Sequence, residues 1–381
     1  MPLWCPEAIG RRKDAQGRWC VHQLTSSSLI SNNVYGEQPY TSPDGKRIAV
    51  LRRYDWTLDV GAALLVADLE FLKLTVIEPL GRVEGVTNSA WTEWIYYWTR
   101  EGNACELWRV SLLTLEKEKL HECGADHPAI GIRSTVSPDF RWIAGTVRNA
   151  DGTHSLARFD VKRGKWETIY ESADPLSHVQ YNPDTGAELV CQVNRGWRMA
   201  NGRWTKIEYD SVGLIVLDAD GGRCREIPMG LPLTRGGTGH ECFIPGTGRV
   251  LFTTRADPER KSELGETTLF VAAPGEDRPT PVPAPGYVFN HVSASRCGTY
   301  FVADSYHDGP PGPVPLIVGN LKTGRLRALV ETGASCGGAQ YTHPHPYFTA
   351  DNRHVIYNSD ATGVGQVYEA TVFEDFLESL N

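Results

Sequence analysis

Apolar and polar residues alternate in short runs along most of the chain, and turns of the Ser-Pro-Asp-Gly kind separate the runs. One unit, a turn followed by an apolar strand, recurs at intervals of about 45 to 60 residues. Another strand, a second turn and a fourth strand follow most copies. Alternation with a period of two is typical of β-strands. Clear copies begin at Thr41, Val136, Tyr181 and Phe243, weaker ones at Val292 and Phe348, and a degenerate one at Ala90.

Seven units of four strands predict an all-β fold, a seven-bladed β-propeller that forms a single domain over residues 1–381. The last unit lacks a fourth strand, because the sequence stops soon after Phe373. Residues 18–25 offer a spare strand ahead of the first unit. We expect this N-terminal strand to complete the last blade and close the ring, which would remove exposed strand edges.

Five histidines fall within three positions of the repeat. Because the first strand of a propeller blade lines the central channel and starts at one face, side chains at the start of that strand should lie at the channel mouth. Gln38 of the first unit shares this position, and we expect Gln38 and His178 to contact substrate. Five of the eleven histidines lie seven to nine residues before the turn glycine or its substitute: His178, His240, His291, His343 and His345.

Arginines recur at the ends of the second strands, which should reach the same mouth. Their clustering predicts a locally basic face on an acidic protein, suited to a substrate that carries carboxylates. Arginine is also ordinary at a solvated strand end, so each residue either contacts substrate or stays in solvent. The residues are Arg53, Arg100, Arg148, Arg195 and Arg255.

The stretch from Gln340 to Pro346 reads Q-Y-T-H-P-H-P. If it is extended, His343 and His345 point to the same side, and the prolines occupy the other phase of an edge strand. Two imidazoles on one face can bind a metal. The other six histidines are expected to be structural or surface residues: His22, His121, His127, His154, His307 and His354.

The insert between Asn194 and Val212 is typical of a binding loop. Its Trp197 and Trp204 could stack on a sugar ring or could pin the loop to the surface. Cys242 follows His240 closely, but in a strand that begins a blade we expect a small buried residue and not a nucleophile. No G-x-S-x-G elbow, P-loop or H-E-x-x-H motif is present.

The composition indicates the cellular compartment and excludes some classes of partner. Nine cysteines without a C-x-x-C pair favour neither a disulfide framework nor a zinc cluster and indicate a reducing cytoplasm. No apolar run resembles a signal peptide or could cross a membrane. The net charge of −8 argues against general nucleic-acid binding.

Three segments in order, T-G-H-E-C-F, N-H-V-S-A-S-R-C-G-T-Y-F and Q-Y-T-H-P-H-P-Y-F, resemble the oligogalacturonate lyases, a polysaccharide lyase family. The resemblance spans most of the chain. It implies a seven-bladed propeller that cleaves a small acidic oligosaccharide by β-elimination, with a divalent metal, Mn²⁺, as cofactor. By motif it implies His240 as the general base. The metal ligands that it implies are His291, Gln340, His343 and His345.

The sequence departs from that family at one place. Members carry an arginine in an R-I-W strand about 25 residues before the base, whereas Gly213 or a neighbour stands at that place here. Arg195 or Arg198 is expected to substitute from the insert. The departure leaves open a lyase for another uronate, such as a glucuronate-containing oligosaccharide. A non-catalytic binding propeller of the TolB kind shares the repeats, and a peptidase propeller would need a hydrolase domain that is not seen.

Overall fold

The computed structural model describes residues 2–35, 38–54, 61–102, 104–123, 134–200, 203–206, 212–257, 259–306 and 312–381. Strands dominate these residues; the only helical elements among them are the short α1 (Glu374–Glu378) and the 3-10 turn η1 (Gln340–Thr342). Within this part of the chain, no helix has the length and apolarity needed to span a membrane. The chain divides into two compact units, unit 1 with residues 1–127 and 293–381, and unit 2 with residues 128–292.

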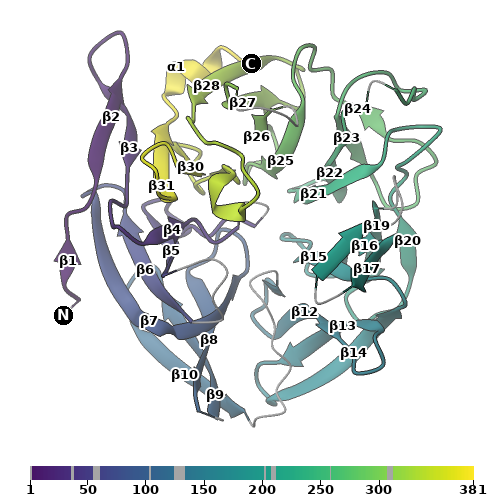
Figure 1. The fold of residues 1–381 in the computed structure, drawn as a ribbon, viewed down its shortest axis with the longest axis horizontal. Helices are drawn as coiled ribbons and strands as arrows, with labels where there is room; N and C mark the ends of the chain where they lie inside the picture. Colours follow the sequence, from purple (N-terminus) through teal and green to yellow (C-terminus); the bar gives the residue numbers. More distant parts are fainter. Residues whose placement is uncertain are drawn as a thin grey trace. The chain divides into compact units, whose positions relative to one another are not determined.

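Unit 1 contains an eight-stranded sheet in which two blades share one long strand (Figure 1). The first part of β7 pairs with β6, and its last residues pair with β8. The degenerate repeat at Ala90 thus marks a real blade. The strands are β1 (Trp4–Cys5), β4 (Ile30–Asn32), β5 (Arg47–Arg53), β6 (Ala62–Asp68), β7 (Lys73–Asn88), β8 (Trp94–Glu101), β9 (Ala104–Ser111) and β10 (Lys117–Cys123).

The last sheet of unit 1 joins the two ends of the chain. The N-terminal β3 pairs with β31, as predicted for the spare strand, while the closure of a ring stays a prediction. A further strand, β2, pairs with β3 and was not predicted. The strands of this sheet lie in the order β2 (Ile9–Lys13), β3 (Trp19–Gln23), β31 (Gln366–Thr371), β30 (His354–Ser359) and β29 (Tyr347–Phe348).

Another four-stranded sheet consists of β25 (Phe289–Ala294), β26 (Tyr300–Ser305), β27 (Pro315–Asn320) and β28 (Leu326–Glu331). The division between the units falls inside β25, so the strand that carries His291 continues into unit 1.

Unit 2 holds three four-stranded sheets and a hairpin. The hairpin is the insert predicted as a binding loop, and the side chains of Trp197, Arg198 and Trp204 lie outside the described part of the structure. The first two sheets are β11 (Thr135–Val136), β12 (Trp142–Arg148), β13 (His154–Asp160), β14 (Lys165–Ser172), and β15 (Leu176–Tyr181), β16 (Glu188–Asn194), β19 (Val212–Asp218), β20 (Cys224–Glu226). The third sheet and the hairpin are β21 (Gly237–Ile244), β22 (Arg249–Thr254), β23 (Leu269–Ala272), β24 (Thr280–Pro281), and β17 (Trp197–Ala200), β18 (Arg203–Lys206).

Burial explains why these sequences form these strands. Middle strands are apolar on both faces, and every residue of β6 (A-A-L-L-V-A-D) is buried. Outer strands such as β14 (K-W-E-T-I-Y-E-S) have no fully buried residue and mix charged with apolar side chains. Burying each Val, Leu, Ile or Phe contributes about 1.5 to 3 kcal/mol. The blades are therefore held by their middle strands, and the strand ends and turns carry the chemistry.

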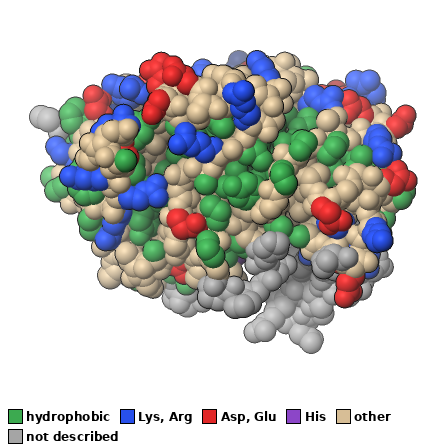
Figure 2. Space-filling view, turned by 90° about the horizontal axis from the view of Figure 1, so that it is seen from above, with side chains coloured by type: hydrophobic (Ala, Val, Ile, Leu, Met, Phe, Trp, Pro, Cys, Tyr) green, Lys and Arg blue, Asp and Glu red, His purple; other side chains and the backbone are tan. Residues whose placement is uncertain are grey.

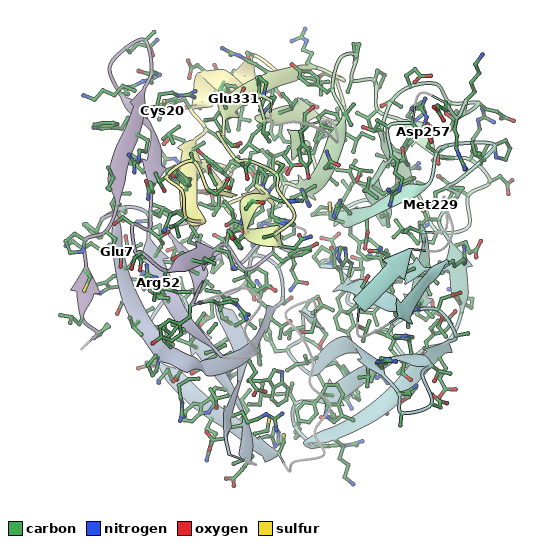
Figure 3. All side chains as sticks on the ribbon, viewed as in Figure 1. Glu7, Cys20, Arg52, Met229, Asp257 and Glu331 are labelled. Carbon is green, nitrogen blue, oxygen red and sulfur yellow. The ribbon has the colours of Figure 1, made fainter. Side chains whose placement is uncertain are left out.

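Ion pairs fasten the N-terminal segment. Arg52 of β5 donates from both terminal nitrogens to the two carboxylate oxygens of Glu7, at 3.1 and 2.7 Å (Figure 3). This two-point geometry is the strong form of the pair. Elsewhere acidic and basic side chains intermix, as the face in Figure 2 shows.

Candidate metal centre

The Q-Y-T-H-P-H-P stretch is not an extended strand, so that prediction is wrong. Gln340–Thr342 form the 3-10 turn η1, and β29 starts only at Tyr347. His343 is extended, whereas His345 has a φ of +44°, a left-handed conformation that is rare for a residue other than glycine. The two imidazoles nevertheless lie nearly parallel, with ring centroids 6.0 Å apart and planes at 18°. The turn achieves by local geometry what strand alternation was expected to provide.

Gln340 and His345 present two donor atoms to one point. Gln340 Oε1 lies 3.0 Å from His345 Nε2. Two ligands about 2.1 Å from a cation, on adjacent corners of an octahedron, are about 3 Å apart. The spacing therefore fits a shared cation; His345 is 2% exposed and Gln340 is half-buried.

His343 is oriented through both ring nitrogens. Nε2 lies 2.7 Å from the carbonyl oxygen of Gly337, which can only accept, so this nitrogen carries the proton. Nδ1 is then the nitrogen with the lone pair, and the hydroxyl of Tyr306 lies 3.2 Å from it. A ligating histidine typically has its other ring nitrogen held in this way.

Unit 2 carries three imidazoles side by side. The rings of His178 and His240 are nearly parallel, with centroids 5.9 Å apart, and the ring of His240 is 4.1 Å from that of His291. They come from β15, β21 and β25, the first strands of their sheets. The repeat register thus brings these three predicted residues together.

One ring nitrogen of His240 is held by the backbone. Its Nδ1 lies 3.1 Å from the carbonyl oxygen of Asn290, so Nδ1 carries the proton and Nε2 is the basic nitrogen. Gly239 precedes it with a φ of +90°, and a Cβ there would lie 2.3 Å from Gln192 Nε2. Only glycine therefore lets the chain pass Gln192 and present His240.

One group of side chains among the described residues could hold a metal ion, and it consists of His291, His343 and His345. Each offers one ring nitrogen, and these nitrogens all lie within 4.8 Å of one another. Together with Gln340, these are the residues that the resemblance implied. Neutral nitrogen and amide ligands suit a divalent cation and leave its charge available to an anionic ligand.

Four of the five arginines end their strands or follow directly after them, and Arg100 lies one residue before the end of β8. Two of them already have acidic partners: Arg100 Nε contacts Glu84, and Arg195 Nη2 lies 2.6 Å from Glu226. Burial lowers the pKa of Arg53, Arg148 is exposed, and Arg255 is half-buried. A role in substrate binding stays a prediction for each.

Arg195 lies against Gly213. A Cβ at Gly213 would come within 2.8 Å of Arg195 Nη1, so the guanidinium occupies the space that a side chain at position 213 would need. Gln38 has a structural environment, because its amide donates to the carbonyl and side-chain oxygens of Asn88. Cys242 is buried, as expected, and none of the nine cysteines, all of them among the described residues, forms a disulfide.

The sequence pattern did not identify Tyr306, which directly follows β26 where other blades carry arginine. It also missed Tyr35, whose ring centroid is 4.6 Å from that of His345. The strand-end register could have found Tyr306. Of the histidines expected to be structural, His127 and His307 lie outside the described residues.

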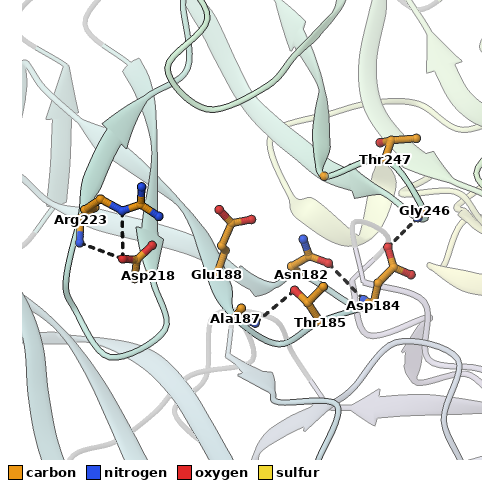
Figure 4. A pocket seen from close by; sticks show the side chains of 10 residues that line it. Asn182, Asp184, Thr185, Ala187, Glu188, Asp218, Arg223, Gly246 and Thr247 are labelled. Carbon is orange, nitrogen blue, oxygen red and sulfur yellow. Dashed lines mark hydrogen bonds and ion pairs between the residues drawn. The ribbon is translucent and has the colours of Figure 1, made fainter.

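A cavity of about 630 Å³ opens near the turns of the β15–β16 and β21–β22 hairpins (Figure 4). Its carboxylates have internal partners. Asp184 accepts from the backbone N–H of Gly246 at 2.5 Å, and Asp218 accepts from Arg223. These contacts hold the turns, at the strand ends away from the histidines.

No family model matches the chain. The oligogalacturonide lyase of Pectobacterium atrosepticum is 24% identical over 310 residues, which cover 71% of this chain and 73% of that protein. A solved oligogalacturonate lyase in complex with manganese has a TM-score of 0.72 at 18% identity, with 99% of both chains covered. The oligogalacturonate lyase of Vibrio parahaemolyticus has a TM-score of 0.73 at 18% identity, covering 98% of this chain and 99% of the other.

These matches agree with the repeats and sheets described above, in which seven blades are recognised among the described residues. The fold is a β-propeller, and the sequence relatives and the structural neighbours carry the same family name. The chain is therefore similar in sequence and in fold to the oligogalacturonate lyases.

Proposed function

We propose that this protein is a metal-dependent lyase that cleaves short oligogalacturonate by β-elimination and leaves an unsaturated 4-deoxy uronate. The observation that carries the proposal is the donor pair Gln340 Oε1 and His345 Nε2, 3.0 Å apart. His343 and His291 would complete the ligand set, and the spacing of the three histidine nitrogens supports this. Manganese is the cation of choice, because a neighbour of the same fold was solved with it.

β-Elimination removes the weakly acidic proton at C5 of a uronate, next to its carboxylate. A divalent cation held by these residues would act as a Lewis acid on the carboxylate and stabilise the charge that develops. His240 Nε2 accepts the C5 proton, and the Nδ1–H bond to the Asn290 carbonyl keeps this nitrogen basic. The electron pair of the C5–H bond forms the C4–C5 double bond. The C4–O bond breaks, and the departing oxygen takes a proton from water or an acid.

Arg195 would balance the charge of a second carboxylate or of the leaving group. Its place over Gly213 supports this role, because the guanidinium fills the position where the family's arginine would start. The absence of the family's arginine at position 213 also favours a second candidate function, a lyase for another uronate. Cysteines without disulfides among the described residues fit a reducing compartment such as the cytoplasm.

The test is a direct assay. Protein supplied with manganese and di- or trigalacturonate should develop the absorbance of an unsaturated uronate, and chelation should remove the activity. A parallel panel with glucuronate-containing oligosaccharides separates the two lyases. The proposal fails if no uronate in the panel yields an unsaturated product.

A further inference from the structure

Three successive carbonyl groups of the metal-binding segment accept hydrogen bonds from two asparagines, all within unit 1. The side chain of Asn33 donates to the carbonyl oxygen of His345 at 2.7 Å. The backbone N–H of Asn358 donates to Pro344 O at 2.8 Å, and its side chain donates to His343 O at 3.4 Å. The backbone of both candidate ligands is thus held from outside the segment.

The two asparagines also hold each other. The backbone N–H of Asn33 donates to Asn358 Oδ1 at 2.9 Å. Asn33 is 0% exposed and Asn358 is 2% exposed, so water cannot replace these bonds. One asparagine directly follows β4 and the other lies in β30, which makes them a bridge between the first and the last blade.

The segment needs such support. His345 has a φ of +44° although it precedes a proline, and a residue before proline favours extended backbone. Conformations of this kind persist only where the surroundings hold them, and they are frequent at ligand sites. Without the bond from Asn33, His345 could relax, and Nε2 would move away from Gln340 Oε1.

We propose that Asn33 and Asn358 are positioning residues that hold His343 and His345 in the geometry required to bind the divalent cation. The inference rests on the proposed function, and it adds residues that touch neither the cation nor the substrate. Loss of an outer-shell partner typically weakens metal binding by about 10- to 100-fold. We expect the upper part of that range for Asn33→Ala and the lower part for Asn358→Ala, whose backbone bond to Pro344 remains.

Isothermal titration of metal-free protein with manganese chloride measures the effect. The matched control is Asn320→Ala. Asn320 is equally buried, donates to a backbone carbonyl (Leu380 O, 3.2 Å) and accepts from backbone N–H groups, but it lies at the C-terminal end of β27. Thermal melts of the metal-free variants check folding, and Asn33→Ser replaces the alanine variant if that one does not fold.

Weaker binding in the Asn33 and Asn358 variants, with unchanged binding in Asn320→Ala, is the expected result. Excess manganese should then restore lyase activity. Wild-type affinity in folded Asn33 and Asn358 variants would overturn the positioning role while the proposed function stands. Wild-type protein that binds no manganese would overturn both.

Discussion

Unit 1 contains two pairs of histidines with opposite environments, one in its last sheet and one in the segment that precedes β29. His345 lies beside the amide oxygen of Gln340, and His343 lies beside the carbonyl of Gly337 and the hydroxyl of Tyr306, all of them neutral groups. His22 and His354 enclose a carboxylate instead, because their Nδ1 atoms lie 2.6 and 2.8 Å from the two oxygens of Glu369. The imidazole is the same in both places, and the neighbouring oxygen decides what it can do.

A buried carboxylate between two imidazoles is already satisfied. Glu369 is 2% exposed, and burial tends to raise its pKa, but the hydrogen bonds from His22 and His354 prevail and lower it. An amide oxygen has no charge to neutralise, so the other pair keeps donor capacity for a cation. Glu369 with His22 and His354 joins β3, β30 and β31, whereas His343 and His345 are proposed metal ligands.

The largest contrast is expected between His345→Ala and His354→Ala. Loss of His345 removes a proposed ligand, so metal affinity should fall by more than the about 100-fold expected for an outer-shell change, and activity should fall to background. His354→Ala should bind manganese normally. Titration of both variants measures this, and equal affinities would remove the distinction between the pairs.

His240→Ala should abolish proton removal without affecting the ligands. We expect activity to fall by about 10²- to 10⁴-fold, the usual contribution of a general base. Metal content should stay at the wild-type level, in contrast to His345→Ala. Activity near wild type in this variant would remove His240 from the role of base.

Glu369→Gln should act on stability alone. Removing the charge of a buried carboxylate that binds two imidazoles is expected to lower the free energy of unfolding by about 3 kcal/mol, measured by urea denaturation. Manganese affinity should not change, because none of the proposed ligands contacts Glu369. A loss of metal binding in the folded variant would show that the two pairs are coupled.

The carboxylate of Glu369 should also make the stability of the protein depend on pH in the acid range. The folded-state pKa of Glu369 lies below the ordinary 4.5, so its contribution is present above about pH 4.5 and is lost as the pH falls through the folded-state value. Wild-type stability should therefore decline more steeply below pH 4.5 than that of Glu369→Gln. Parallel declines would contradict this assignment.

The smallest effect on stability is expected at an exposed pair. The side chains of Arg195 and Glu226 are 45% and 69% exposed, so Arg195→Ala should change the free energy of unfolding by less than about 1 kcal/mol. Lyase activity should nevertheless fall if Arg195 meets the substrate. Unchanged kinetics in this variant would leave Arg195 as a surface residue.

Much of the fold could be predicted because each blade repeats a local pattern. Alternation and turns predicted the blades, including the degenerate one at Ala90, and the pairing of β3 with β31. The repeat register gathered His178, His240 and His291 because equivalent strand positions lie at equivalent places in successive blades.

Contacts between segments that are distant in the sequence could not be predicted from the alternation of apolar and polar residues. Nothing in the alternation near Asn33 reveals a bond to His345, and nothing near His22 reveals Glu369. The 3-10 turn at Gln340 also broke the period-two expectation, because two prolines and a left-handed histidine rule out a regular strand there. Local sequence patterns predict the strands, whereas the candidate metal site lies in an irregular segment just outside a strand.

The metal content of the protein as isolated, measured by elemental analysis beside Gln340→Ala, tests the central claim most directly. The account predicts one divalent cation per wild-type chain, with manganese giving the active form, and little or none in the variant. A wild-type protein that holds no stoichiometric cation after incubation with manganese would contradict it.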